Sequence, residues 1–203
     1  MFHERLRKET DMSKPELIKS SGKFFIAAAF AFITILTGSD PFAIPGSVVS
    51  GILLAVGMSR LREGYGERIG ALGRNMLLLG MFGPVLWIIG IAFMAIMGEE
   101  AVREGLWVLL FVGPAGSLFG LTLFGLTALL TKPMPRLNWL PVLAGIWYPV
   151  TFVLFSIYDI SHKGVFPDQY VPALVLMVVL QFLILCILGF VLIDDSSKEL
   201  ATA

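Results

Sequence analysis

Six long apolar stretches, separated by short polar ones, dominate the pattern of hydrophobic and polar positions along this chain. None of these stretches contains Asp, Glu, Lys, Arg or His. Apolar runs of this kind are typical of helices that cross a bilayer, whose hydrocarbon core is about 30 Å thick. We therefore predict an all-α integral membrane protein, a compact Gly/Pro-rich bundle with six transmembrane helices at residues 24–38, 42–59, 76–97, 106–130, 139–158 and 170–193.

The polar ends of the chain set the expected organisation: a charged N-terminal segment at 1–23, a transmembrane domain at 24–193 and a tail at 194–203. The first apolar run is short, about 22 Å as a helix, although Leu17 and Ile18 can extend that helix upstream. A second interpretation is a secretory signal, cleaved among the small residues that follow the run. Both interpretations stay open.

Basic residues predict the orientation. If the amino terminus is cytoplasmic, the inner segments are the head, a polar Gly-broken loop at 60–75, the connection 131–138 and the tail. These segments hold 13 of the 15 lysines and arginines. Cytoplasmic connections of membrane proteins carry an excess of Lys and Arg. We therefore expect both termini inside, and the compactness of the chain favours a bacterial cytoplasmic membrane.

The amino-acid composition limits which kinds of binding and catalytic site the chain can form. Hydrophobic residues make up 57% of the 203 and charged residues 15%, with a mean hydropathy of +0.85. The formal net charge is zero, which gives no basic excess for nucleic acid. The single cysteine, Cys186, excludes an internal disulfide, and the two histidines, His3 and His162, lie outside the spans, so haem between helices is not expected. We expect no cofactor and no metal.

Polar and aromatic residues recur near the middle of the predicted spans. If the spans are aligned by depth, one layer contains Ser50, Trp87, Ser117, Trp147, Tyr148 and Gln181. Indole, phenol and amide groups need hydrogen-bond partners when they are buried. Two explanations stay open: hydrogen bonds that join helices, or a pocket for a lipid-like or aromatic ligand.

Prolines and glycines interrupt the same spans. Pro84, Pro114 and Pro149 each remove a backbone donor in mid-helix, which produces either a packing kink or a hinge at a site. Gly116 and Gly120 have the Gly-x-x-x-Gly spacing that lets two helix backbones approach closely. Packing within the chain and a homodimer seam are both consistent with that spacing, and the first is favoured.

The run from Gly113 to Gly120 also resembles the Gly-x-Ser-Gly region of the rhomboid intramembrane proteases, whose cores have six spans. That resemblance implies a serine nucleophile, but Ala115 stands at its position. No predicted span supplies the histidine base that such chemistry needs. Peptide cleavage is therefore not expected.

Two loops carry groups that could serve as ligands or catalysts. One loop contains Asp159, His162 and Asp168, and the other contains Glu99, Glu100 and Glu104. A single histidine without a second nitrogen or sulfur ligand is weak support for a zinc site. The three glutamates lack the alternating oxygen spacing of a calcium loop. We interpret both loops as solvated connections.

With no charged, metal-binding or nucleophilic group at depth, we expect a non-enzymatic membrane protein. The favoured hypothesis is a subunit, scaffold or accessory protein, in contact with the lipid bilayer and either homo-oligomeric or part of a larger complex. The alternative is a small carrier or binding protein for an apolar uncharged or lipid-like substrate. A hydrolase or transferase that uses the loop residues is a third hypothesis.

Overall fold

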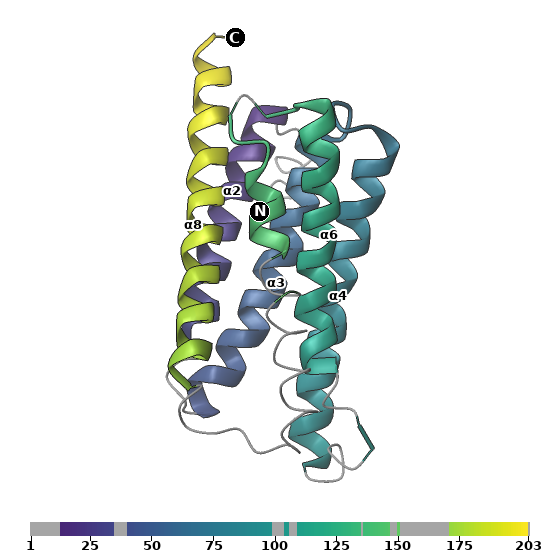
Figure 1. Ribbon diagram of the computed structural model, residues 1–203, viewed down its shortest axis with the longest axis vertical. Helices are drawn as coiled ribbons and strands as arrows, with labels where there is room; N and C mark the ends of the chain where they lie inside the picture. Colours follow the sequence, from purple (N-terminus) through teal and green to yellow (C-terminus); the bar gives the residue numbers. More distant parts are fainter. Residues whose placement is uncertain are drawn as a thin grey trace, which may run out of the picture.

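The computed structural model describes residues 13–34, 40–98, 104–105, 109–134, 136–146, 150 and 171–202. Long helices account for most of them: α2 (Lys14–Ile33), α3 (Asp40–Tyr65), α4 (Gly70–Met97), α6 (Leu109–Thr131) and α8 (Val171–Thr202). Residues 140–146 form a short helix as well. These helices run roughly along the long axis of the molecule (Figure 1). The described part of the chain is all-helical, as the sequence predicts.

Four of these helices are long and apolar enough to cross a membrane: Ile44–Tyr65, Gly70–Met97, Val112–Thr131 and Val178–Lys198. They correspond to the predicted spans 42–59, 76–97, 106–130 and 170–193. Helix α2 does not join them, because its first half carries Lys14, Glu16, Lys19 and Lys23. The predicted span 139–158 is described only at 140–146 and at residue 150.

Helix α2 begins inside the charged head. Ser13 precedes the helix, Pro15 lies in its first turn, and the backbone N–H of Ser13 donates to Oε2 of Glu16 at 2.9 Å. Proline in a first turn and a Ser-x-x-Glu cap are both typical of a helix start. The helix then continues past residue 24 to Ile33, so the upstream extension expected from Leu17 and Ile18 is present.

Two boundaries differ from the sequence interpretation. The polar loop expected at 60–75 is mostly helical, since α3 continues to Tyr65 and α4 begins at Gly70. Helix α8 continues through the expected tail to Thr202. In both places the helix keeps a buried inward side while most of its charged side chains lie on the outward side, and Asp195 is the buried exception. The rise in polarity therefore did not end either helix.

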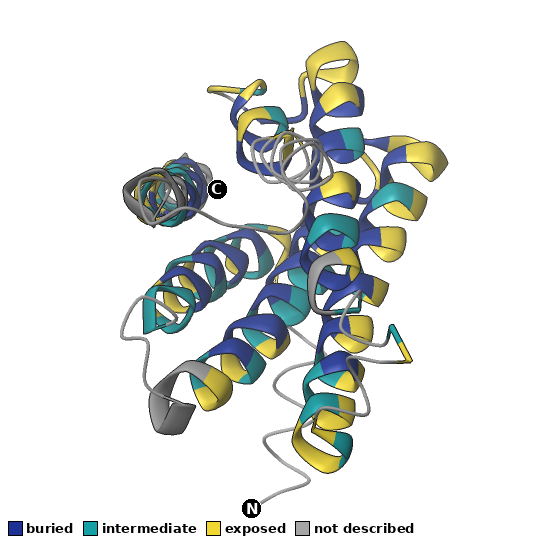
Figure 2. Ribbon diagram, turned by 60° about the horizontal axis from the view of Figure 1, so that its bottom comes forward, coloured by how far each residue is buried: buried dark blue, intermediate teal, exposed yellow. Residues whose placement is uncertain are grey.

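The helices form a ring around a central core. Helix α4 packs on α6, α2 packs on both α3 and α8, and α3 packs on α4. The short helix 140–146 completes the ring, because Gly145 lies against α6 and Gln181 of α8 donates to the carbonyl of Ala144. Figure 2 shows buried residues on the inner faces and exposed ones outside. Fully buried side chains from several helices fill the core: Phe25, Met58, Leu61, Leu77, Leu121, Phe124, Leu188 and Leu192.

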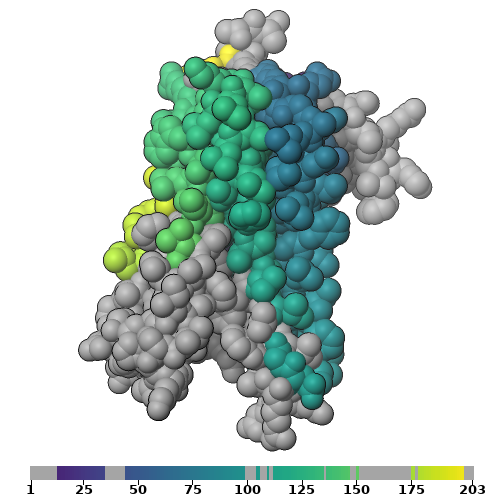
Figure 3. All heavy atoms as spheres, turned by 45° about the vertical axis from the view of Figure 1, so that its right-hand side comes forward, coloured from purple at the N-terminus to yellow at the C-terminus, as the bar shows by residue number. Residues whose placement is uncertain are grey.

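Helices α4 and α6 lie side by side along one face of the molecule (Figure 3) and pack on each other more extensively than the other described helix pairs do. A Cβ atom added at Gly120 would lie 2.4 Å from Cα of Gly80, and one added at Gly83 would lie 2.3 Å from the carbonyl oxygen of Gly113. Only glycine allows two helix backbones to meet at such distances. We call these four residues the α4–α6 glycine seam.

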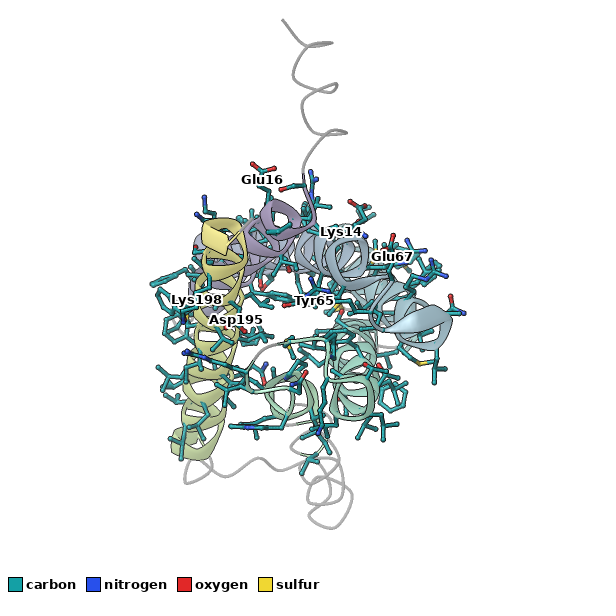
Figure 4. All side chains as sticks on the ribbon, turned by 90° about the horizontal axis from the view of Figure 1, so that it is seen from above. Lys14, Glu16, Tyr65, Glu67, Asp195 and Lys198 are labelled. Atoms are coloured by element: carbon teal, nitrogen blue, oxygen red, sulfur yellow. The ribbon has the colours of Figure 1, made fainter. Side chains whose placement is uncertain are left out.

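Polar connections meet at one end of the ring, which Figure 4 shows from above. Lys14 of α2 forms an ion pair with Glu67 in the turn between α3 and α4, and Nη1 of Arg68 donates to the carbonyl of Pro133 at 3.4 Å. The hydrogen bond from Lys14 holds the pKa of Glu67 below its ordinary value. The Lys14–Glu67 pair is exposed and contributes little to stability. Together with the part-buried bond from Arg68, it joins α2, the α3–α4 turn and the connection after α6.

Candidate ligand cavity in the middle of the bundle

A cavity lies inside the ring, and five helices contribute to its wall. The unfilled space in and around it is about 370 Å³, a figure that includes open solvent. The innermost part has room for about one water molecule. The lining residues come from α2, α3, α4, α6 and α8, and they are Ala28, Phe32, Ser50, Leu54, Trp87, Pro114, Leu118, Gln181 and Leu185. No ionisable side chain is among these lining residues, so the cavity suits an uncharged molecule.

Gln181 is the most polar group in the cavity wall. It lies on the inward side of α8, with 3% of its surface exposed. Its Nε2 donates to the carbonyl oxygen of Ala144 at 3.0 Å. Its Oε1 has no hydrogen-bond partner among the described residues. A buried amide oxygen without a partner costs about 1–3 kcal/mol, so a donor that reached this oxygen would be stabilising.

Trp87 forms another side of the cavity and is held in place by its neighbours. The indole is 7% exposed and meets the ring of Phe32 edge-on, with 6.2 Å between ring centroids. A Cβ atom at Gly51 would lie 3.4 Å from the indole, and one at Gly113 would lie 2.6 Å from Cβ of Trp87. The two glycines therefore leave the space in which the indole sits.

The two serines expected in the middle layer have different roles. Ser50 lines the cavity, and its Oγ donates to the carbonyl of Ala28 at 2.9 Å, which joins α3 to α2. Ser117 is fully buried, and its Oγ donates to the carbonyl of Gly113 at 3.2 Å within α6. Ser117 faces Gly83 across the α4–α6 glycine seam and does not line the cavity. Trp147 and Tyr148 lie outside the described residues.

Helix-interior prolines lie beside the same region. Pro114 lines the cavity and Pro84 is buried between α3 and α4, close to where a Cβ atom at Gly51 would stand. Helices α4 and α6 continue through both prolines without a break. Pro149 is outside the described residues. The prolines thus occur in continuous helices next to the cavity.

Gly116 and Gly120 are four residues apart but lie in different surroundings. Gly120 belongs to the α4–α6 glycine seam, where an added Cβ would contact backbone atoms of α4 at 2.4 and 2.6 Å. At Gly116, the one contact of an added Cβ with the described part of the chain would be with Cα of Gly83, at 3.8 Å, which is ordinary van der Waals contact. Close packing within the chain therefore depends on Gly120, while Gly116 has space for a larger residue.

Asp195 is a buried carboxylate that the sequence analysis placed in the polar tail. Its residue surface is 2% exposed, and its Oδ2 has no partner among the described residues. In Figure 4, Asp195 from α8 and Tyr65 from α3 both point toward the middle of the ring. Neighbouring Asp194 is exposed and pairs instead with Arg136, at 3.8 Å, and with Lys198.

A periodic signal could have found Asp195. Gln181, Leu185, Leu188, Leu192 and Asp195 follow one another at steps of four, three, four and three residues. This spacing keeps residues on one side of a helix, and all five are buried. The inward side of α8 therefore extends two residues past the predicted end of the span.

Metal ligands do not gather in the part of the chain that the structure describes, where no group of three His, Cys, Asp or Glu side chains could hold an ion. Cys186 is buried in α8. Glu104 is exposed. Asp159, His162, Asp168, Glu99 and Glu100 lie outside the described residues.

The cavity is the structural feature that bears most directly on function. No protein-family model, curated protein or solved structure matches this chain. The arrangement itself offers a largely apolar wall, a fixed indole and one unpaired hydrogen-bond acceptor. Such a site can hold a neutral molecule and orient one polar group of it.

Proposed function

We propose that this protein binds a small, uncharged and largely apolar molecule in the cavity between its helices, as a carrier or binding protein of a membrane. The observation that carries the proposal is the unpaired Oε1 of Gln181, a residue of a largely apolar cavity wall. Ligand sites of this class combine a hydrophobic lining with a few fixed polar groups. Trp87, held between Gly51 and Gly113, supplies a rigid flat surface for the apolar part of the ligand.

The proposal includes the setting of the bundle. We propose six spans in a bacterial cytoplasmic membrane, with both termini inside and no nucleic-acid partner. The polar turn 66–69, the connection 132–138, the start of α2 and the end of α8 meet at one end of the ring, and most of the described basic residues belong to these segments. An excess of basic residues at one end supports a cytoplasmic assignment of that end.

Filling the cavity tests the binding function. Ala28 lines the cavity on α2, so Ala28→Leu extends a side chain into the empty space. We expect the affinity for indole, a small neutral aromatic probe, to fall at least tenfold, because the added atoms occupy its volume. Isothermal titration calorimetry on purified protein in detergent measures this change.

Ala27→Leu is the matched control, since Ala27 is the next residue on the same helix and is exposed. This variant adds the same atoms on the outer surface and should bind indole as the unchanged protein does. Equal affinity of the two variants, or no saturable binding by the unchanged protein, would contradict the proposed function.

A second candidate function is that of a subunit or scaffold, which two observations favour. The innermost part of the cavity is small, and the outward side of α4 carries a continuous row of large exposed side chains: Leu72, Leu79, Phe82, Leu86, Phe93 and Ile96. Rows of this kind face either lipid or another membrane helix. Under this proposal we expect a homo-oligomer or a larger complex after mild detergent extraction and crosslinking. A strictly monomeric species, measured by light scattering, would speak against it.

A further inference from the structure

The orientation of the Gln181 amide limits which ligands the cavity can accept. A side-chain amide has two hydrogen-bonding groups, an NH₂ that donates and an oxygen that accepts. The NH₂ of Gln181 is directed at the carbonyl of Ala144, which can only accept, so the amide cannot turn over without losing that bond. The oxygen therefore remains the side of the amide that lacks a partner.

Ser50 is a second polar side chain in the cavity wall, and it too can offer a ligand only an acceptor. Ser50 has already committed its hydroxyl proton to the carbonyl of Ala28 at 2.9 Å, so its remaining capacity is that of an acceptor. Gln181 and Ser50 can thus offer a ligand only acceptors, while Trp87, which also lines the cavity, carries an indole N–H donor. A ligand that brings only acceptors would still leave Oε1 of Gln181 unpaired.

We propose, on the basis of the binding function proposed above, that Gln181 selects neutral ligands that donate a hydrogen bond, such as hydroxyl or ring N–H compounds, over apolar molecules of the same shape. A site built around one polar partner discriminates strongly against an analogue that lacks the matching group, because the polar atom of the site is then buried without a partner. The apolar wall and the indole of Trp87 bind the rest of either molecule equally. Gln181 is therefore the specificity-determining residue of the cavity.

Indole and benzothiophene provide the test. The two molecules are neutral and nearly identical in shape, but indole has a ring N–H and benzothiophene has a sulfur atom in its place. We expect the unchanged protein to bind indole about tenfold more tightly than benzothiophene, as one hydrogen bond to a buried acceptor requires. Titration calorimetry in the same detergent gives both dissociation constants.

Gln181→Met keeps the length of the side chain and removes its acceptor. We expect this variant to bind the two probes equally, with benzothiophene bound at least as well as by the unchanged protein. Retained binding of benzothiophene also shows that the cavity is still formed without the hydrogen bond to Ala144.

The outcomes separate the two proposals. Equal binding of both probes by the unchanged protein, lost in Ala28→Leu, would overturn the selection by Gln181 and leave the cavity as the binding site. No binding of either probe would overturn the binding function itself. A preference for indole that persists in Gln181→Met would also overturn the role given to Gln181.

Discussion

Gly120→Ala is expected to lower the free energy of unfolding by about 1–3 kcal/mol or more, because the added methyl group has no space. Its Cβ would lie 2.4 Å from Cα and 2.6 Å from the backbone nitrogen of Gly80. Backbone atoms cannot turn aside as a flexible side chain can, so α4 and α6 must separate along the whole seam. Unfolding in detergent with increasing denaturant, followed by helical circular dichroism, measures the loss.

Gly116→Ala is the matched control on the same helix. An added Cβ there lies 3.8 Å from Cα of Gly83, which is an ordinary contact. Alanine also favours a helix over glycine by about 1 kcal/mol, so this variant should be as stable as the unchanged protein or slightly more stable. If both variants lost stability equally, the seam would not depend on close approach at Gly120.

Asp195→Asn is expected to raise the free energy of unfolding by about 1 kcal/mol or more. The carboxylate is 2% exposed and its Oδ2 has no partner among the described residues. The backbone N–H of Arg136 and the charges of Arg136 and Lys198 offset part of the cost of burying this charge, and a neutral group of the same shape avoids most of the rest. Denaturant unfolding at neutral pH, compared with the unchanged protein, gives the difference.

Asp194→Asn is the matched control, because it removes a carboxylate that is charged but not buried. Asp194 is the neighbouring residue, is exposed, and pairs with Arg136 and Lys198 at the surface. Exposed pairs contribute about 0–1 kcal/mol, so this variant should lose little stability. A loss of stability in Asp195→Asn would mean that the interactions of the carboxylate with Arg136 and Lys198 outweigh the cost of burying it, and this prediction would be wrong.

The predicted helices follow from apolar length, and α3, α4, α6 and α8 have the places that the pattern predicts. The ends were not predictable from polarity alone. Charged residues such as Arg60 and Glu63 were interpreted as a loop, although they continue α3 while Leu61 and Tyr65 remain buried on its inner side. The same error placed the buried Asp195 in a tail.

The positions of the candidate site residues along their helices were predictable from the sequence, but the directions in which their side chains point were not. Ser50, Trp87 and Gln181 were expected at one level and all three line the cavity. Ser117 was expected there too, but it faces the α4–α6 glycine seam. Depth follows from counting residues along a span, whereas direction depends on which neighbour each helix meets. A single sequence does not show which helices pack against each other.

Glycines join the helices in two pairs. Gly80 and Gly120 join α4 to α6, and a Cβ atom at Gly22 would lie 2.5 Å from the carbonyl oxygen of Gly189, so α2 meets α8 in the same way. The cavity lies between these two pairs, and residues of both line it. A molecule bound there would add contacts between the pairs and raise the melting temperature of the protein, as any ligand specific to the native state does. Thermal screening of membrane lipid extracts could therefore identify the natural ligand before any transport assay exists.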